Sequence, residues 1–137
     1  MRILLLWKEP LPKKIIERTR GGGRYTEAEF WSFIRSALRQ KSRRWAPIYQ
    51  CMNDARRASK DKSNPKLKWQ YKCAKCRKWK PAKEVSVDHI VPAGSLRREE
   101  DLARFVSTLF CEQDNLQVLC KPCHDKKPRR ILNDDTG

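Results

Sequence analysis

The chain has 137 residues, of which 39 % are hydrophobic and 35 % are charged, so we expect one compact domain or a small module with an extension. Its 32 Lys and Arg residues outnumber its 16 Asp and Glu residues, and the net charge of +16 favours a polyanionic partner, with DNA as the first choice. A membrane partner and an exported protein are disfavoured. The apolar run at residues 3–7 is shorter than a secretory signal or a membrane span, which favours the cytoplasm.

The N-terminal half is predicted to be a basic helical extension. Residues 1–24 have the composition of a flexible basic arm, which ends in three glycines. Thr26 and Glu29 have the spacing of a capping box at a helix start, and Pro47 favours the first turn of a second helix, so residues 25–68 are predicted to be two helices and a linker. Residues 1–69 carry 18 Lys and Arg against 6 Asp and Glu, a net of +12. We therefore expect DNA to contact four arginines of this extension: Arg35, Arg39, Arg43 and Arg44.

The C-terminal half has the pattern of a small α+β module. Short strands are predicted at residues 69–71, 84–91 and 115–119 from their aromatic and β-branched side chains. A helix is predicted at residues 95–110, and a short helix after Cys120. Residues 69–128 would form this module and residues 129–137 a tail. Residues 70–137 carry 14 Lys and Arg against 10 Asp and Glu, a net of +4.

Four of the six cysteines form two pairs with Cys-x-x-Cys spacing: Cys73, Cys76, Cys120 and Cys123. Four thiolates are the ligand set of a tetrahedral structural zinc. Because no secretory signal is evident, reduced thiolates are favoured over disulfides. A Cys₃His site that uses His124 instead of one cysteine is the alternative. The other two cysteines, Cys51 and Cys111, are predicted to be small buried hydrophobic residues.

Four polar residues lie between and beside these pairs: Asp88, His89, Asn115 and His124. Asp88 and His89 belong to the second predicted strand, Asn115 begins the third, and His124 follows nine residues after Asn115. In this order they resemble the HNH endonucleases, a family built on the ββα-metal finger. The resemblance covers residues 69–128 and implies an α+β fold with a Cys₄ structural zinc. It departs from compact members because about 25 residues separate His89 from Asn115 and because the first 68 residues carry no family motif.

The roles of the site residues follow from general chemistry and from this resemblance. His89 is the predicted general base, because a neutral imidazole accepts a proton at cellular pH. The resemblance implies that Asp88 and His124 hold a catalytic Mg²⁺, Mn²⁺ or Ni²⁺ ion and that Asn115 positions the His89 loop; in some members the residue matching Asn115 ligates the metal itself. Neighbouring strand residues point to opposite faces, so Asp88 and His89 share a site only if the strand ends, bends or bulges there. Two lysines beside the site are predicted DNA contacts: Lys126 and Lys127.

The sequence thus predicts a metal-dependent DNA endonuclease that nicks or cuts duplex DNA. Small HNH proteins of this sort are common in bacteriophages, so the resemblance implies the cytoplasm of a bacterial host, with other phage or host DNA-processing proteins as further candidate partners. The alternative is a non-catalytic, zinc-dependent nucleic-acid binding module. Such a module needs the cysteines and the basic residues but has no use for Asp88, His89 and His124 together.

Overall fold

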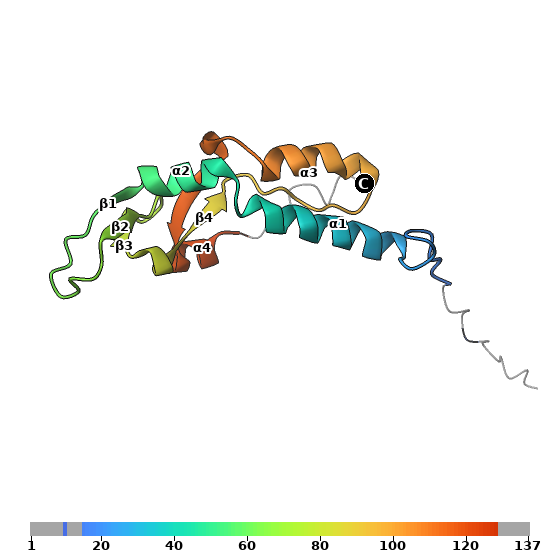
Figure 1. The fold of residues 1–137 in the computed structure, drawn as a ribbon, viewed down its shortest axis with the longest axis horizontal. Coiled ribbons are helices and arrows are strands. Elements are labelled where there is room, and N and C mark those ends of the chain that lie inside the picture. Colours follow the sequence, from blue (N-terminus) through green and yellow to red (C-terminus); the bar gives the residue numbers. More distant parts are fainter. Residues whose placement is uncertain (1–9, 11–14, 129–137) are drawn as a thin grey trace, which may run out of the picture.

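A computed structural model describes residues 10 and 15–128 of the chain (Figure 1). The predicted tail at residues 129–137 and most of the first fourteen residues of the predicted arm lie outside the described residues. The fold is of the mixed α+β class, with four α-helices and two small antiparallel sheets among the described residues. Within this part of the chain, no helix combines the length and the apolar character that a membrane crossing requires.

Helix α1 (Glu27–Ser42) begins at the predicted capping box. The Thr26 hydroxyl accepts a hydrogen bond from the Glu29 backbone N–H at 3.1 Å, and the Glu29 carboxylate accepts one from the Thr26 N–H at 3.1 Å. The pair satisfies two backbone donors that the helix cannot use internally. One face of α1 carries Trp31 into a hydrophobic cluster with Leu96 and Phe105, so α1 packs beside α3 (Leu102–Leu109).

Helix α2 (Ala46–Asp54) carries Pro47 in its first turn, as predicted. The indole N–H of Trp45, the residue before this helix, donates to the Cys111 carbonyl at 2.6 Å. Cys51 and Cys111 are both buried in the second hydrophobic cluster, which confirms their prediction as core residues. In that cluster α2 packs on strand β5 (Leu116–Cys120).

Three short strands form an antiparallel sheet in the order β1 (Arg56–Ala58), β2 (Trp69–Lys72) and β3 (Trp79–Lys80). Only β2 was predicted. The segments of β1 and β3 have three and two residues and little apolar alternation, so their sequences carry no strand signal. Because Arg57 pairs with Gln70, β1 joins the predicted N-terminal extension to the module that begins at residue 69.

The second sheet consists of β4 (Val85–His89) and β5, which pair from Val85 opposite Cys120 to His89 opposite Leu116. Helix α4 (Lys121–Lys126) follows β5 directly and contacts both strands. Between the two strands, the predicted helix at residues 95–110 is shorter than expected. Residues 95–98 are not helical, Glu99–Asp101 form a 3-10 turn, and α3 begins at Leu102. The Asp101 carboxylate accepts a hydrogen bond from the Arg97 backbone N–H at 3.0 Å, and α3 begins without a side-chain cap.

Candidate functional site

The four paired cysteines come together between the two sheets. Cys73 and Cys76 lie in the turn between β2 and β3, Cys120 ends β5, and Cys123 lies in α4. Their four sulfur atoms all lie within 4.8 Å of one another. All six cysteines of the chain are free thiols. A metal at this cluster therefore cross-links the three-stranded sheet to the β4–β5 hairpin and α4.

The geometry and the ionisation of this cluster fit a metal such as zinc. The Sγ atoms of Cys76 and Cys120 are 3.7 Å apart, and a tetrahedral site with Zn–S bonds of about 2.3 Å has an S···S separation of about 3.8 Å. Burial opposes ionisation of Cys73, but hydrogen bonds from backbone N–H groups, first that of Cys120, outweigh it and lower its pKa to about 6. Hydrogen bonding to the Cys120 sulfur, with burial, raises the pKa of Cys123 to about 12. A bound cation would favour the thiolate form of all four cysteines.

Asp88 and His124 face each other beside this cluster. Asp88 lies on β4 and His124 on α4, and the Asp88 Oδ1 atom is 3.7 Å from His124 Nε2. This separation exceeds a hydrogen bond, and neither atom makes a hydrogen bond to another described residue. A cation with ligand distances of about 2.1 Å can contact two atoms up to about 4.2 Å apart. One carboxylate oxygen and one imidazole nitrogen are donors that suit Mg²⁺, Mn²⁺ or Ni²⁺.

His89 is fixed by the end of helix α3. Its Nε2 atom lies 3.0 Å from the carbonyl oxygen of Leu109, the last residue of α3. A carbonyl only accepts, so Nε2 carries the proton and Nδ1 is the basic nitrogen of the neutral ring. The Leu109 carbonyl is one of the four at a helix C-terminus that lack a partner within the helix, and this end of the helix dipole favours a cation. The segment that separates His89 from Asn115 in the sequence thus supplies the group that orients His89.

Asn115 closes the loop that follows His89. Its Oδ1 atom accepts from the Val91 N–H at 2.8 Å, and its Nδ2 atom donates to the Val91 carbonyl at 3.1 Å. The Asn115 carbonyl also accepts from the Ile90 N–H at 2.8 Å. Asn115 lies in a 3-10 turn before β5 and not within the strand as predicted. Strand β4 ends at His89, two residues before the end of the predicted strand, which is one of the three alternatives that would let Asp88 and His89 share a site, and both residues line the pocket at this end.

Lys127 has contacts that the sequence did not reveal. Its ammonium donates to Asp88 Oδ2 at 2.6 Å, to the His89 carbonyl, and to the Ile90 carbonyl at 3.4 Å. Gln117 donates to the same Asp88 oxygen at 3.2 Å. Lys127 was predicted to contact DNA, whereas here its charged group lies inside the site and neutralises Asp88. Its sequence neighbour Lys126 is exposed, so it is accessible for the predicted contact with DNA.

These side chains line a pocket of about 270 Å³ at the end of β4. Asp88, His89, His124 and Lys127 line it together with Arg39, which reaches it from α1. The Arg39 guanidinium lies 5.4 Å from the centre of the Phe105 ring. Burial, and then repulsion from Arg35, lowers the pKa of Arg39 below its ordinary value, although an arginine remains charged at neutral pH.

The four arginines that were predicted to contact DNA therefore have different surroundings. Arg35 is half-buried, whereas Arg39, Arg43 and Arg44 are exposed, and of the four only Arg39 lines the pocket. Arg35 and Arg39 lie on α1, and Arg43 and Arg44 follow its last residue.

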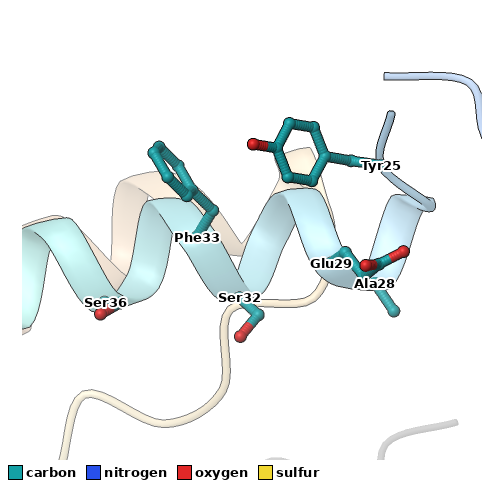
Figure 2. A pocket seen from close by; sticks show the side chains of 6 residues that line it. All are labelled: Tyr25, Ala28, Glu29, Ser32, Phe33 and Ser36. Atoms are coloured by element: carbon teal, nitrogen blue, oxygen red, sulfur yellow. The ribbon is translucent and has the colours of Figure 1, made fainter. Parts of the chain in front are cut away.

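A second pocket lies near the start of α1 and has none of this chemistry. Figure 2 shows the rings of Tyr25 and Phe33 side by side on one side of the helix, with their centroids 6.1 Å apart. Glu29 is the single ionisable carboxylate of its lining, and it is held by the capping box and by Arg18. This pocket therefore offers no metal-binding or acid–base group that is free to act.

No family model, no curated protein and no solved structure matches this chain. The geometry of the pocket and of the cysteine cluster is therefore the basis for inferring a function.

Proposed function

We propose that this protein is a metal-dependent DNA endonuclease of the HNH type, which hydrolyses phosphodiester bonds in the pocket at the end of β4. One observation carries the proposal: the Leu109 carbonyl fixes the proton of His89 on Nε2, in a pocket that Asp88 and His124 also line. A histidine with one nitrogen committed in this way offers the other as a general base. The order of two antiparallel strands and a helix, β4–β5–α4, is also that of a ββα-metal finger.

His89 is the base in the proposed reaction. Its Nδ1 atom takes a proton from a water molecule as the water oxygen forms a bond to phosphorus. The bond from phosphorus to the leaving sugar oxygen breaks, and that oxygen takes a proton from solvent. The Leu109 carbonyl and the C-terminal end of α3 stabilise the imidazolium that forms.

Asp88 and His124 are the residues that would hold the catalytic cation. A divalent cation there would stabilise negative charge on the phosphate oxygens and on the leaving oxygen. The separation of 3.7 Å between Asp88 Oδ1 and His124 Nε2, and the mixed oxygen and nitrogen donors, support this assignment. The four cysteines would hold a structural zinc, which fixes His124 because Cys123 is its immediate neighbour.

Three further side chains prepare the pocket. Asn115 keeps the chain after His89 in place through its two hydrogen bonds with Val91. Lys127 holds Asp88 and the carbonyl of His89 in a fixed relation. Arg39 contributes a positive charge, and its fork of N–H donors suits the oxygens of a phosphodiester.

The direct test is the conversion of supercoiled plasmid to nicked or linear DNA by purified protein with Mg²⁺, Mn²⁺ or Ni²⁺, and with EDTA as the metal-free control. We expect cutting with at least one of these ions, none with EDTA, and none by a His89→Ala variant prepared in parallel. Plasmid that stays intact with every ion while the protein still binds it would contradict the proposal. That result would favour a zinc-dependent nucleic-acid binding module without catalysis.

A further inference from the structure

The positive charge of the chain is concentrated in one segment that the structure folds into the three-stranded sheet. Residues 56–83 carry 12 Lys and Arg against one acidic residue, Asp61, a net of +11 out of the +16 of the whole chain. The boundary at residue 69 between the predicted N-terminal extension and the predicted module divides this segment. Strand β1 lies before that boundary and its partner β2 begins at it. We call residues 56–83 the basic sheet. Its basic residues are Arg56, Arg57, Lys60, Lys62, Lys66, Lys68, Lys72, Lys75, Arg77, Lys78, Lys80 and Lys83.

The charges of the basic sheet are not neutralised within the protein. Among the described residues, none of its lysines and arginines forms a salt bridge. Its single carboxylate, Asp61, is hydrogen-bonded to Ser63. By contrast, Arg18 and Arg20 near the start of α1 are paired with Glu29 and Glu27. Unpaired positive charges at this density attract a polyanion.

Two arginines of the edge strand β1 are held in place by tryptophans. The guanidinium of Arg56 lies 4.1 Å from the ring centre of Trp69, and that of Arg57 lies 4.0 Å from the ring centre of Trp79. Arg57 also donates two hydrogen bonds to the Gln70 side chain at 3.1 and 3.2 Å. Stacking restricts a guanidinium and leaves its N–H edges accessible, apart from the Nε–Nη2 edge of Arg57, which Gln70 occupies, so less conformational entropy is lost when an anion binds.

The shape of the basic sheet suits one class of anion, duplex DNA. Neighbouring residues of a strand point to opposite faces, so Arg56 and Arg57 put positive charge on both sides of the β1–β2 pair. The loop at residues 59–68 adds four exposed lysines and projects from one end of the molecule (Figure 1). The major groove of duplex DNA is about 12 Å wide and admits a two-stranded ribbon, with a row of phosphates on each side.

We propose that the basic sheet is a docking surface for duplex DNA, with the β1–β2 hairpin in a groove and its basic side chains on the phosphates of both strands. The basic residues run from the projecting loop to the turn that holds Cys73 and Cys76, and so lead toward the cysteine cluster beside the pocket. A lipid surface would need several apolar side chains to insert, and among the described residues the basic sheet exposes one large apolar side chain, Trp69, which Arg56 covers on one face. Single-stranded DNA would need open aromatic faces, and an arginine covers one face of each tryptophan.

This inference goes beyond the proposed chemistry, and its test does not require cutting. Binding of a labelled duplex of about 30 base pairs is measured by fluorescence anisotropy at several salt concentrations, with His89→Ala as the parent protein. One variant replaces the four loop lysines by glutamine: Lys60, Lys62, Lys66 and Lys68. A matched variant loses the same charge from exposed residues elsewhere: Arg24, Lys41, Arg43 and Arg44. Two of these, Arg43 and Arg44, were predicted to contact DNA, so the pair of variants also decides between the two surfaces.

We expect the loop variant to bind about ten- to a hundredfold more weakly near 0.1 M salt and to reduce the slope of log K against log salt by about 3, at about 0.9 for each lost phosphate contact. The matched variant should change that slope by less than about 1. Equal effects of the two variants would overturn the proposal, because net charge alone would then explain binding. No effect of the loop variant would also overturn it.

A second variant tests the stacked arginines with the charge kept constant. Arg56→Lys with Arg57→Lys should weaken duplex binding several-fold at an unchanged salt slope, because the charge remains while the stacked, two-pronged geometry is lost. Tighter binding of a single strand than of the duplex of the same length would contradict docking in a groove. Thermal unfolding followed by circular dichroism checks that each variant is folded.

Discussion

The pocket and the basic sheet differ in whether their charged side chains have partners within the protein. Residues 84–128, which supply every residue of the pocket lining except Arg39, carry six Lys and Arg against eight Asp and Glu, a net of −2, whereas the basic sheet has a net of +11. Asp88, His89 and Lys127 in the pocket, and Asn115 in the loop beside it, are each held by hydrogen bonds within the protein. In the basic sheet, the charged groups have no acidic partners among the described residues. Catalytic groups need fixed positions, whereas groups that bind a polyanion need charges that no acidic side chain of the protein neutralises.

The cysteine cluster lies between the pocket and the basic sheet, so its loss should disrupt both regions and have the largest effect. We predict that Cys120→Ser loses the bound metal and unfolds both, since structural zinc supplies on the order of 10 kcal/mol in such modules. Cys51→Ser is the matched control. Cys51 is a buried thiol outside the cluster, so its variant should keep the metal and lose only about 1–3 kcal/mol of unfolding free energy.

Elemental analysis of the purified proteins and their circular dichroism spectra distinguish the two variants. A wild-type protein that is folded without any bound metal would show that the cluster does not connect the two regions in this way.

His89→Ala should have the next largest effect, which should fall on the cutting rate and not on duplex affinity. We expect a loss of about 10²- to 10⁴-fold in single-turnover cutting, which is the usual contribution of a general base. Duplex affinity should stay within about twofold, because His89 is bonded to Leu109 and lies outside the basic sheet. Added imidazole should restore part of the rate by acting as a free base. Cutting by the variant at the wild-type rate would remove His89 from this role.

Lys127 allows a finer test inside the pocket. Its loss leaves Asp88, whose side chain is 11 % exposed, with Gln117 as its one hydrogen-bond donor among the described residues and with His124 3.7 Å away, so Lys127→Met should cost about 1–3 kcal/mol of unfolding free energy. A divalent cation can replace the lost charge. Mn²⁺ should therefore stabilise Lys127→Met more than it stabilises the wild type, as measured by thermal unfolding of zinc-loaded protein.

Lys126→Met is the control for this prediction, since Lys126 is exposed and makes no hydrogen bond to another described residue. It should unfold at the wild-type temperature. If Mn²⁺ stabilises all three proteins equally, the cation does not bind at Asp88.

Much of this arrangement was predictable from the sequence, and the reasons differ between residues. The capping box of Thr26 and Glu29 is a local signal, because both partners lie within one turn of helix. The cysteine spacing predicted the cluster, since four thiols in two close pairs have few other uses. Strands β4 and β5 were predicted from their apolar, β-branched residues.

The contacts that orient the pocket were not predictable in the same way. The partner of His89 is a backbone carbonyl, which every residue possesses, so no side-chain pattern points to Leu109. Lys127 could be placed beside the site but not in it, because the choice depends on how α4 packs on β4. The basic sheet was hidden because β1 is three residues long and pairs with a strand beyond a lysine-rich loop.

The smallest expected effect belongs to Thr26→Ala. Loss of the cap should lower the unfolding free energy by about 1 kcal/mol, because the Glu29 N–H loses its side-chain acceptor. Helix α1 brings Arg39 to the pocket and contributes nothing to the basic sheet, so duplex affinity should not change. Chemical denaturation with urea measures the change. A loss well above 2 kcal/mol would mean that α1 depends on this end more than its packing on α3 indicates.

The most direct test of the division between the two regions is one titration, the single-turnover cutting rate of duplex DNA as a function of protein concentration. The plateau reports the chemical step, and the protein concentration at half-plateau reports the affinity. We predict that His89→Ala lowers the plateau and leaves the half-plateau concentration unchanged. The variant with four loop lysines replaced should raise the half-plateau concentration about ten- to a hundredfold near 0.1 M salt and reach the wild-type plateau. A loop variant with a lowered plateau, or a His89 variant with weakened binding and a normal plateau, would contradict this account.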